Sequence, residues 1–112
     1  GSEMCIRDSN VTMNESLAVA LLTNLLKNAF VHNIDGGHIR ITVTKNSITF
    51  RNSGVENPLD KEHIFERFYQ GTKKEGSTGL GLAIADSICR LQHLSIRYYF
   101  EQKEHCFEIS RQ

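Results

Sequence analysis

The stretch Asn24-Leu25-Leu26-Lys27-Asn28-Ala29-Phe30-Val31-His32 decides how this sequence is interpreted. It ends a longer run, 14–32, in which leucine and alanine recur at three- and four-residue steps, as in a helix with one apolar face. Asn24, Asn28 and His32 also recur every four residues, so we expect them on one face of that helix. Asparagine is unfavourable inside helices, because its side chain competes for backbone hydrogen bonds. Asn24 and Asn28 therefore predict a polar function at the edge of a core, although two hydrogen-bonded asparagines on a solvated helix face explain the pattern equally well.

The composition is that of one globular domain. The chain has 112 residues, of which 39% are hydrophobic and 23% charged. Thirteen basic and thirteen acidic residues cancel, which argues against a general nucleic-acid binder. Cys5, Cys89 and Cys106 form no CxxC pair, and three cysteines fit a reducing compartment better than a disulfide scaffold. No apolar run approaches the roughly 20 residues that cross a bilayer, so we expect a cytoplasmic domain.

The chain is expected to divide near residue 10. Gly1-Ser2 is typical of the remnant of a cleaved tag, and residues 3–10 show no periodicity. We therefore interpret residues 1–10 as tag remnant and linker, and residues 11–112 as one domain of a longer protein.

The remaining pattern alternates helices and hairpins. We expect an edge strand at 11–13, a helix from the N-cap Asn14 to residue 32 or 33, paired strands at 39–44 and 47–51, a short helix at 60–69, a polar loop at 70–78, a helix at 83–91, and strands at 95–101 and 105–110 joined by a turn at 102–104. This order predicts an α/β two-layer sandwich, in which a mixed, mostly antiparallel sheet of about five strands is covered on one face by about three helices.

Two glycine-containing stretches stand where strands or loops end. Gly54, in Asn52-Ser53-Gly54, permits a close approach of the backbone to a ligand, although a plain turn is the more ordinary explanation. Gly79 and Gly81 begin a helix, where glycine is costly, and there they favour the binding of an anion at the helix N-terminus. Lys73 and Lys74 of the preceding loop are interpreted as solvated charges.

Four stretches together resemble the ATP-binding catalytic domain of sensor histidine kinases, in the wider family that includes gyrase-type ATPases. The resemblance spans residues 11–110. Its motifs are the asparagine box at 24–29, the first glycine box at 52–54, the phenylalanine box at 64–69 and the second glycine box at 77–84.

The resemblance implies a role for each matching residue. Asn28 would ligate the Mg²⁺ that bridges the ATP phosphates, and Asn24 would help to hold the metal and its waters; these two are the catalytic residues implied. His32 would lie near the phosphates. Asn52 would meet the adenine amino group, and Gly54 would let the backbone pass under the base.

The same resemblance makes residues 70–78 an ATP lid that is anchored by Phe65 and Phe68. Thr78, Gly79, Leu80 and Gly81 would bind the nucleotide, the last three through backbone N–H groups directed at the phosphates.

The sequence departs from the family pattern at four positions. Asn52 replaces the usual aspartate, and Glu56 replaces the second glycine of the first box. Val31 and Gln70 stand where basic residues are frequent. Each change removes charge or flexibility from the implied site. We still expect the domain to bind ATP, but the sequence does not determine whether it turns ATP over.

The implied function is the catalytic domain of a two-component sensor histidine kinase. It would bind Mg-ATP and donate the γ-phosphate to a histidine on an upstream dimerisation domain, which in turn serves a response regulator. This chain has no phosphoacceptor box. We expect it to be monomeric by itself, and its parent protein to be a homodimer anchored in the inner membrane. Asn24 stands where gyrase-type ATPases carry a carboxylate base, which argues against a hydrolase. A weakly catalytic ATP-gated interaction module and an anti-sigma-factor-type serine kinase remain the alternatives.

Overall fold

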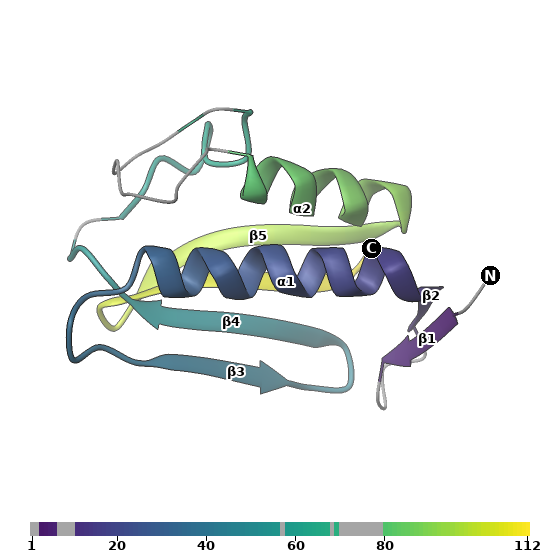
Figure 1. Cartoon of the computed structure of the whole chain (residues 1–112), viewed down its shortest axis with the longest axis horizontal. Coiled ribbons are helices and arrows are strands. Elements are labelled where there is room, and N and C mark those ends of the chain that lie inside the picture. Colours follow the sequence, from purple (N-terminus) through teal and green to yellow (C-terminus); the bar gives the residue numbers. More distant parts are fainter. Residues whose placement is uncertain (1–2, 7–10, 57, 68, 70–79) are drawn as a thin grey trace.

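A computed structural model describes residues 3–6, 11–56, 58–67, 69 and 80–112. Figure 1 shows the order of its elements. They are β1 (Glu3–Ile6), β2 (Val11–Asn14), α1 (Glu15–Val31), β3 (Ile39–Val43), β4 (Ser47–Ser53), α2 (Gly81–Leu91), β5 (Leu94–Glu101) and β6 (Glu104–Arg111).

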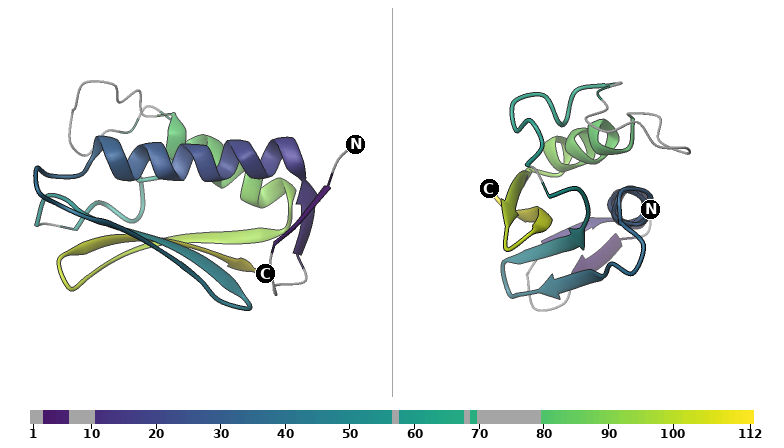
Figure 2. Two further views of the ribbon diagram at one scale, coloured as in Figure 1. Left: turned by 60° about the horizontal axis from the view of Figure 1, so that its bottom comes forward. Right: turned by 90° about the vertical axis from the view of Figure 1, so that its left-hand side faces the viewer.

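The main sheet has four strands in the order β3-β4-β6-β5, and every neighbouring pair is antiparallel. Both helices lie on the same side of this sheet, as the two views of Figure 2 show. The two-layer α/β prediction is therefore confirmed. The details differ, because the described sheet is antiparallel throughout, and β2 pairs with β1 in a separate two-stranded sheet. Residues 3–6, which we had expected in a linker, thus form a strand; the domain boundary at residue 10 stays a prediction.

Helix α1 begins and ends where its sequence predicts. The side-chain oxygen of Asn14 accepts hydrogen bonds from the backbone N–H groups of Ser16 at 2.9 Å and Leu17 at 3.3 Å. It thereby satisfies two of the donors that a helix N-terminus leaves unpaired. At the other end the His32 N–H donates to the carbonyl of Asn28 at 3.1 Å. The chain then turns through Gly36, whose φ of +74° suits glycine.

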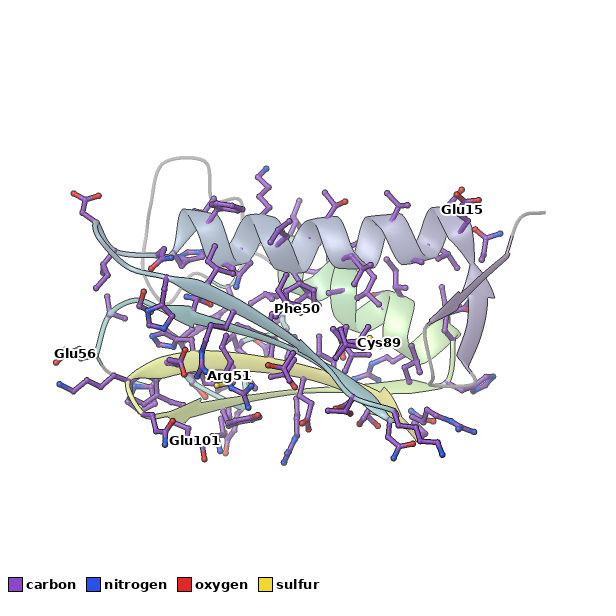
Figure 3. All side chains as sticks on the ribbon, turned by 90° about the horizontal axis from the view of Figure 1, so that it is seen from below. Glu15, Phe50, Arg51, Glu56, Cys89 and Glu101 are labelled. Atoms are coloured by element: carbon purple, nitrogen blue, oxygen red, sulfur yellow. The ribbon has the colours of Figure 1, made fainter. Side chains whose placement is uncertain are left out.

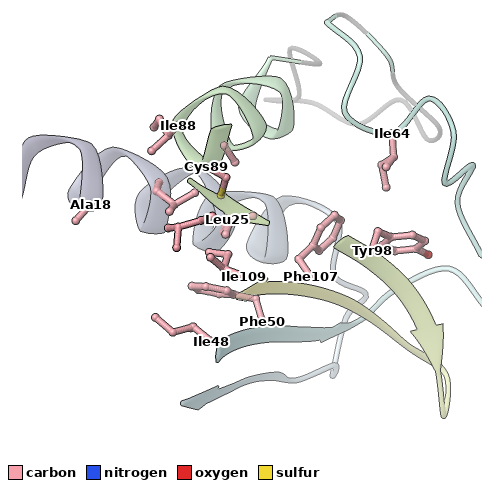
Figure 4. Packing of buried hydrophobic residues seen from close by; sticks show 13 residues of the cluster. Ala18, Leu25, Ile48, Phe50, Ile64, Ile88, Cys89, Tyr98, Phe107 and Ile109 are labelled. Carbon is pink, nitrogen blue, oxygen red and sulfur yellow. The ribbon is translucent and has the colours of Figure 1, made fainter. Parts of the chain in front are cut away.

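The core lies between the helices and the sheet. Along β4, Phe50 points toward the helices, whereas Arg51 points away from them (Figure 3). Figure 4 shows Phe50 and Phe107 of the sheet facing Leu25 of α1, with Ile88 and Cys89 of α2 beside them. The thirteen buried members of this cluster are Ala18, Leu21, Leu25, Ile48, Phe50, Ile64, Ala85, Ile88, Cys89, Leu94, Tyr98, Phe107 and Ile109.

The short helix predicted at 60–69 was wrong, because its described residues form successive turns. The Asp60 side chain accepts from the Glu62 N–H at 2.9 Å and also contacts His63 Nδ1 at 2.6 Å. The bond to Glu62 is of the kind that an N-cap residue makes, so the start of this stretch favours a helix. The Ile64 N–H does reach the carbonyl of Asp60 at 2.9 Å, but the Glu66 N–H bonds only three residues back, to His63, so one helical turn is not continued.

A buried carboxylate joins β6 to β3 on the face away from the helices. Glu104 is only 4% exposed, and it begins β6 rather than lying in the predicted turn. Its carboxylate accepts from Arg40 Nη2 at 2.5 Å and Nε at 3.1 Å, and it contacts His38 Nε2 at 2.8 Å. The hydrogen bond from Arg40 is the main cause that holds the pKa of Glu104 below its ordinary value, and His38 acts in the same direction against the effect of burial.

Candidate functional site

The asparagine face of α1 meets the start of α2. Asn24 is half-buried, and its Nδ2 donates to the carbonyl of Ala20 at 2.7 Å. This bond fixes the amide so that Oδ1 is directed toward α2. A Cβ atom placed on Gly81 would lie 3.3 Å from that oxygen, tighter than most side-chain contacts. Glycine at position 81 therefore permits the close approach of the two helices at the predicted metal and phosphate residues.

The next two residues of the asparagine face lie at the C-terminal end of α1. Asn28 is half-buried one turn after Asn24, and His32 is the C-cap residue. The backbone of His32 is in close contact with the end of β4. Its carbonyl oxygen would lie 2.9 Å from a Cβ atom on Gly54, so only glycine fits there without a shift of the backbone. The structure thus brings His32, at the end of the asparagine face, together with the first glycine box.

Asn52 lies at the centre of this region. It is 1% exposed and alternates with Phe50 and Ile48 on the face of β4 that the helices cover. Its Nδ2 donates to the carbonyl of Ser53 at 2.8 Å. Its Oδ1 is buried without a hydrogen-bond partner among the described residues. A buried polar atom of this kind costs free energy unless a ligand or water satisfies it, so it marks a place where a donor is missing.

A polar link holds the α1–β3 connection against β4. The Ser53 hydroxyl donates to Asn33 Oδ1 at 2.6 Å, and it accepts from the His38 N–H at 2.8 Å. Asn33 in turn donates through Nδ2 to the His38 carbonyl at 3.1 Å. This closed set of bonds fixes the distance between the end of α1 and the end of β4, and hence between His32 and Asn52.

The N-terminus of α2 has the form that binds anions. Leu80 is its N-cap and offers no capping side chain, while its carbonyl accepts from the Ile84 N–H at 2.9 Å. The first helical N–H groups and the positive end of the helix dipole therefore point away from the helix body at Gly81. Part of the predicted site lies outside the described residues, namely Phe68, Gly79 and the predicted lid at 70–78, which includes Gln70 and Thr78.

Phe65 is placed by the core rather than by the predicted short helix. Its ring is half-buried and meets Phe107 edge-on, with 6.2 Å between ring centroids. Of the remaining departures from the family pattern, Val31 is half-buried at the end of α1. Glu56 is exposed, and its carboxylate lies 3.9 Å from Lys103 Nζ. Glu56 therefore extends toward solvent rather than into the site.

Sequence reasoning missed two residues at the border of this site. Tyr98 of β5 and His105 of β6 are both buried, and their side chains contact the segment that follows Gly54. Alternation along β5 and β6 could have placed both on the covered face of the sheet. Nothing in the sequence indicates which loop they contact.

The fold and the arrangement of these motifs define an ATP-binding domain of the type found in sensor kinases. The model of the family described as histidine kinase-, DNA gyrase B-, and HSP90-like ATPase matches residues 13–110, and the chain belongs to this family.

Among curated proteins, the chain is 43% identical over 84 residues to the sensor histidine kinase RppB of Synechocystis sp., a match that covers 67% of this chain and 18% of RppB. It is 38% identical over 94 residues to the heme sensor protein HssS of Staphylococcus aureus, covering 80% of this chain and 21% of HssS. The chain thus spans about a fifth of the length of these relatives.

Solved structures agree with this assignment. The nucleotide-free catalytic domain of histidine kinase ThkA superimposes with a TM-score of 0.73 at 26% identity, covering 88% of this chain and 68% of that one. The mycobacterial sensor histidine kinase MprB also gives a TM-score of 0.73, at 20% identity, covering 90% of this chain and 77% of that one, and it supports the fold alone. Within the described residues, neither helix has the length and apolar character that a membrane span requires.

Proposed function

We propose that this domain binds Mg-ATP between α1, α2 and the end of β4, and donates the γ-phosphate to a histidine on an upstream dimerisation domain of its parent protein. The phosphorylated histidine would then supply a response regulator on the cytoplasmic side. The observation that carries the binding step is the Oδ1 atom of Asn52, which is buried at the end of β4 without a hydrogen-bond partner among the described residues. It lies close to Gly54, where any other residue would require a shift of the backbone.

The environment of Asn52 suits the adenine base. An exocyclic amino group donates hydrogen bonds, and the Asn52 oxygen is an acceptor that lacks a donor among the described residues. At Gly54 the backbone of His32 and the ring of His105 take up the place of a side chain, and this packing fixes the end of the strand that carries Asn52. The base would reach Asn52 from the face of β4 that the helices cover.

The triphosphate would extend from there toward the N-terminus of α2. The backbone N–H groups of the first turn of α2 would offer donors to phosphate oxygens, and the helix dipole favours their negative charge. Asn24 Oδ1 is oriented toward the same place by the hydrogen bond of its amide to Ala20. The amide oxygens of Asn24 and Asn28 are hard, neutral donors, which fits a Mg²⁺ ion that keeps phosphate and water ligands. The metal, when bound, would neutralise charge on the transferred phosphoryl group.

The same residues favour transfer to a protein side chain over hydrolysis. Hydrolysis needs a base that takes a proton from water, and the Asn24 amide cannot do so. The chain's own contribution is positioning: Asn52 and Gly54 orient the base, and Asn24, Asn28 and the start of α2 orient the phosphates.

The proposal is tested by transphosphorylation. The domain is mixed with γ-labelled ATP, Mg²⁺ and a purified phosphoacceptor segment from the upstream part of the parent protein, in parallel with Asn28→Ala. We expect label on a histidine of the segment only with Mg²⁺ and only with the wild-type domain. Release of inorganic phosphate at the same rate without the segment would identify a hydrolase instead. Binding of ATP with no label on the segment would identify an ATP-gated module.

A further inference from the structure

The segment that follows Gly54 is fastened at both ends to one buried pair of side chains. His105 Nε2 lies 2.7 Å from the carbonyl oxygen of Val55, and the Leu59 N–H donates to the hydroxyl of Tyr98 at 2.9 Å. The Tyr98 hydroxyl and His105 Nδ1 are 2.7 Å apart. The four groups form one continuous chain of hydrogen bonds that leaves the segment at Val55 and returns to it at Leu59.

The direction of each bond in this chain follows from its ends. A carbonyl can only accept, so Nε2 of His105 carries a proton and donates to Val55. A backbone N–H can only donate, so the Tyr98 oxygen accepts from Leu59. The Tyr98 hydroxyl hydrogen is then directed to Nδ1 of His105, and every donor and acceptor in the chain is used once. Burial raises the pKa of Tyr98, which keeps this hydroxyl protonated and able to donate.

Packing prevents the pair from adjusting its position. Tyr98 and His105 are 5% and 3% exposed. The Tyr98 ring packs on Phe107 at 5.1 Å between centroids, and the His105 ring packs on Phe100 at 4.8 Å. Figure 4 shows Tyr98 beside Phe107, at the end of the core nearest the segment that contains Ile64. The two side chains are thus fixed by the core and can in turn fix a loop.

The pair also borders the residues proposed to bind the base. His105 is the register partner of Asn52 across β4 and β6. Its Cδ2 atom would lie 3.0 Å from a Cβ atom on Gly54, so the imidazole packs directly against that glycine. Asn52, Gly54 and Val55 are consecutive or nearly so along the chain. A shift of the segment after Gly54 would therefore disturb the packing of His105 on Gly54, two residues from Asn52.

We propose that Tyr98 and His105 are positioning residues for the purine base: they hold Val55 and Leu59 on the sheet and so keep Asn52 and Gly54 in the geometry that accepts it. This inference rests on the proposed function, because it assigns the pair to the affinity for ATP. Neither side chain is assigned a contact with the nucleotide itself.

The test compares two tyrosines that are neighbours on β5. Tyr98→Phe removes the hydroxyl that links Leu59 to His105 and keeps the ring. Tyr99→Phe is the matched control, because the Tyr99 hydroxyl accepts from Arg51 Nη2 at 3.3 Å on the opposite face of the sheet. The affinity for Mg-ATP is measured by calorimetry well below the unfolding temperature, and hydrogen exchange is measured at the Leu59 amide. A neutral hydrogen bond corresponds to roughly twofold to tenfold in an equilibrium constant. We expect Tyr98→Phe to weaken ATP binding by about that factor and to speed exchange at Leu59, whereas Tyr99→Phe changes neither.

A second pair of variants tests His105 and also serves if Tyr98→Phe fails to fold. His105→Gln keeps an N–H that can donate to Val55, whereas His105→Met has a side chain of similar length without a donor. We expect the glutamine variant to retain more of the ATP affinity than the methionine variant. If the wild type binds Mg-ATP and all three variants bind it with the same affinity, the positioning role is overturned and the proposed function stands. A wild-type chain that binds no ATP would overturn the proposed function itself.

Discussion

The carbonyl oxygen of His32 lies 2.9 Å from the place that a Cβ atom on Gly54 would occupy. This contact joins the C-cap of α1 to the residue after β4, although 21 residues separate the two along the chain. It brings the end of the asparagine face into contact with the strand that carries Asn52. The candidate site is built on this junction.

Replacement of Gly54 by alanine should disturb both stability and binding. The added methyl group would meet the backbone of His32 and the ring of His105, and neither is the free end of a flexible side chain. Overpacking of this kind typically costs about 1–3 kcal/mol of unfolding free energy. We expect a loss of that size in urea denaturation together with weaker ATP binding. A variant with unchanged stability would show that the junction is looser than the structure describes.

Replacement of Asn28 by alanine should remove the metal-dependent part of ATP binding. Its amide oxygen is the donor that we assign to Mg²⁺, so its loss leaves only the contacts of the base and backbone. Calorimetric titration with ATP, with and without Mg²⁺, measures this difference. Lys27→Ala is the control, because Lys27 is an exposed residue of the same helix. Equal Mg-ATP affinity in wild type and Asn28→Ala would refute the metal-ligand role.

Replacement of Asn52 by aspartate should sharpen the preference for ATP over GTP. A carboxylate only accepts hydrogen bonds, so it binds the adenine amino group and repels the guanine carbonyl at that position. A charged acceptor adds about 1 kcal/mol over a neutral one, which corresponds to roughly fivefold to tenfold in ATP affinity. The measurement is the ratio of the dissociation constants for ATP and GTP in both proteins.

The structure adds a second effect for the same variant. Asn52 Nδ2 donates to the Ser53 carbonyl, and an ionised aspartate would place an acceptor against that oxygen. We therefore expect Asn52→Asp to unfold more readily than the wild type in the absence of nucleotide. If the nucleotide ratio stays the same, Asn52 does not contact the base.

The Glu104 carboxylate should make part of the stability depend on pH. Its pKa is lowered in the folded chain from a reference value of 4.5, mainly by Arg40. A lowered carboxylate pKa stabilises the fold fully above the unfolded value, and this stabilisation is lost as the pH falls through the folded pKa. We expect Glu104→Gln to lower the unfolding temperature most at pH 7, and the difference from wild type to shrink below about pH 4.5. A difference that stays constant down to pH 3 would contradict the linkage.

The elements that could be predicted are those whose signal is local. The apolar period of α1 and the Asn14 cap lie within a few residues of each other, and so do the alternating residues of the two hairpins. The predicted helix at 60–69 failed because the single helical bond from Ile64 to Asp60 is followed by turns in which Glu66 and Tyr69 each bond only three residues back, and periodicity does not detect this.

The candidate site was predictable from its motifs but not from its contacts. Asn24, Asn28, Asn52 and Gly54 were candidates because each belongs to a recognisable stretch, and their roles stay predictions. The bonds from Tyr98 and His105 to the segment after Gly54 join residues about 40 or 50 positions apart, which no local pattern encodes. The unpartnered oxygen of Asn52 likewise depends on three-dimensional burial.

Binding of Mg-ATP between Asn52 and the start of α2 is tested most directly by a map of backbone amide chemical shifts during titration with Mg-ATP. We expect the largest changes on Asn52–Gly54 and on the first turn of α2, from Gly81 to Ala83, and we expect them to saturate together with one dissociation constant. Changes confined to the outer face of the sheet around Arg40, Arg51 and Arg97, with none at Asn52 and Gly81 under saturating nucleotide, would contradict it.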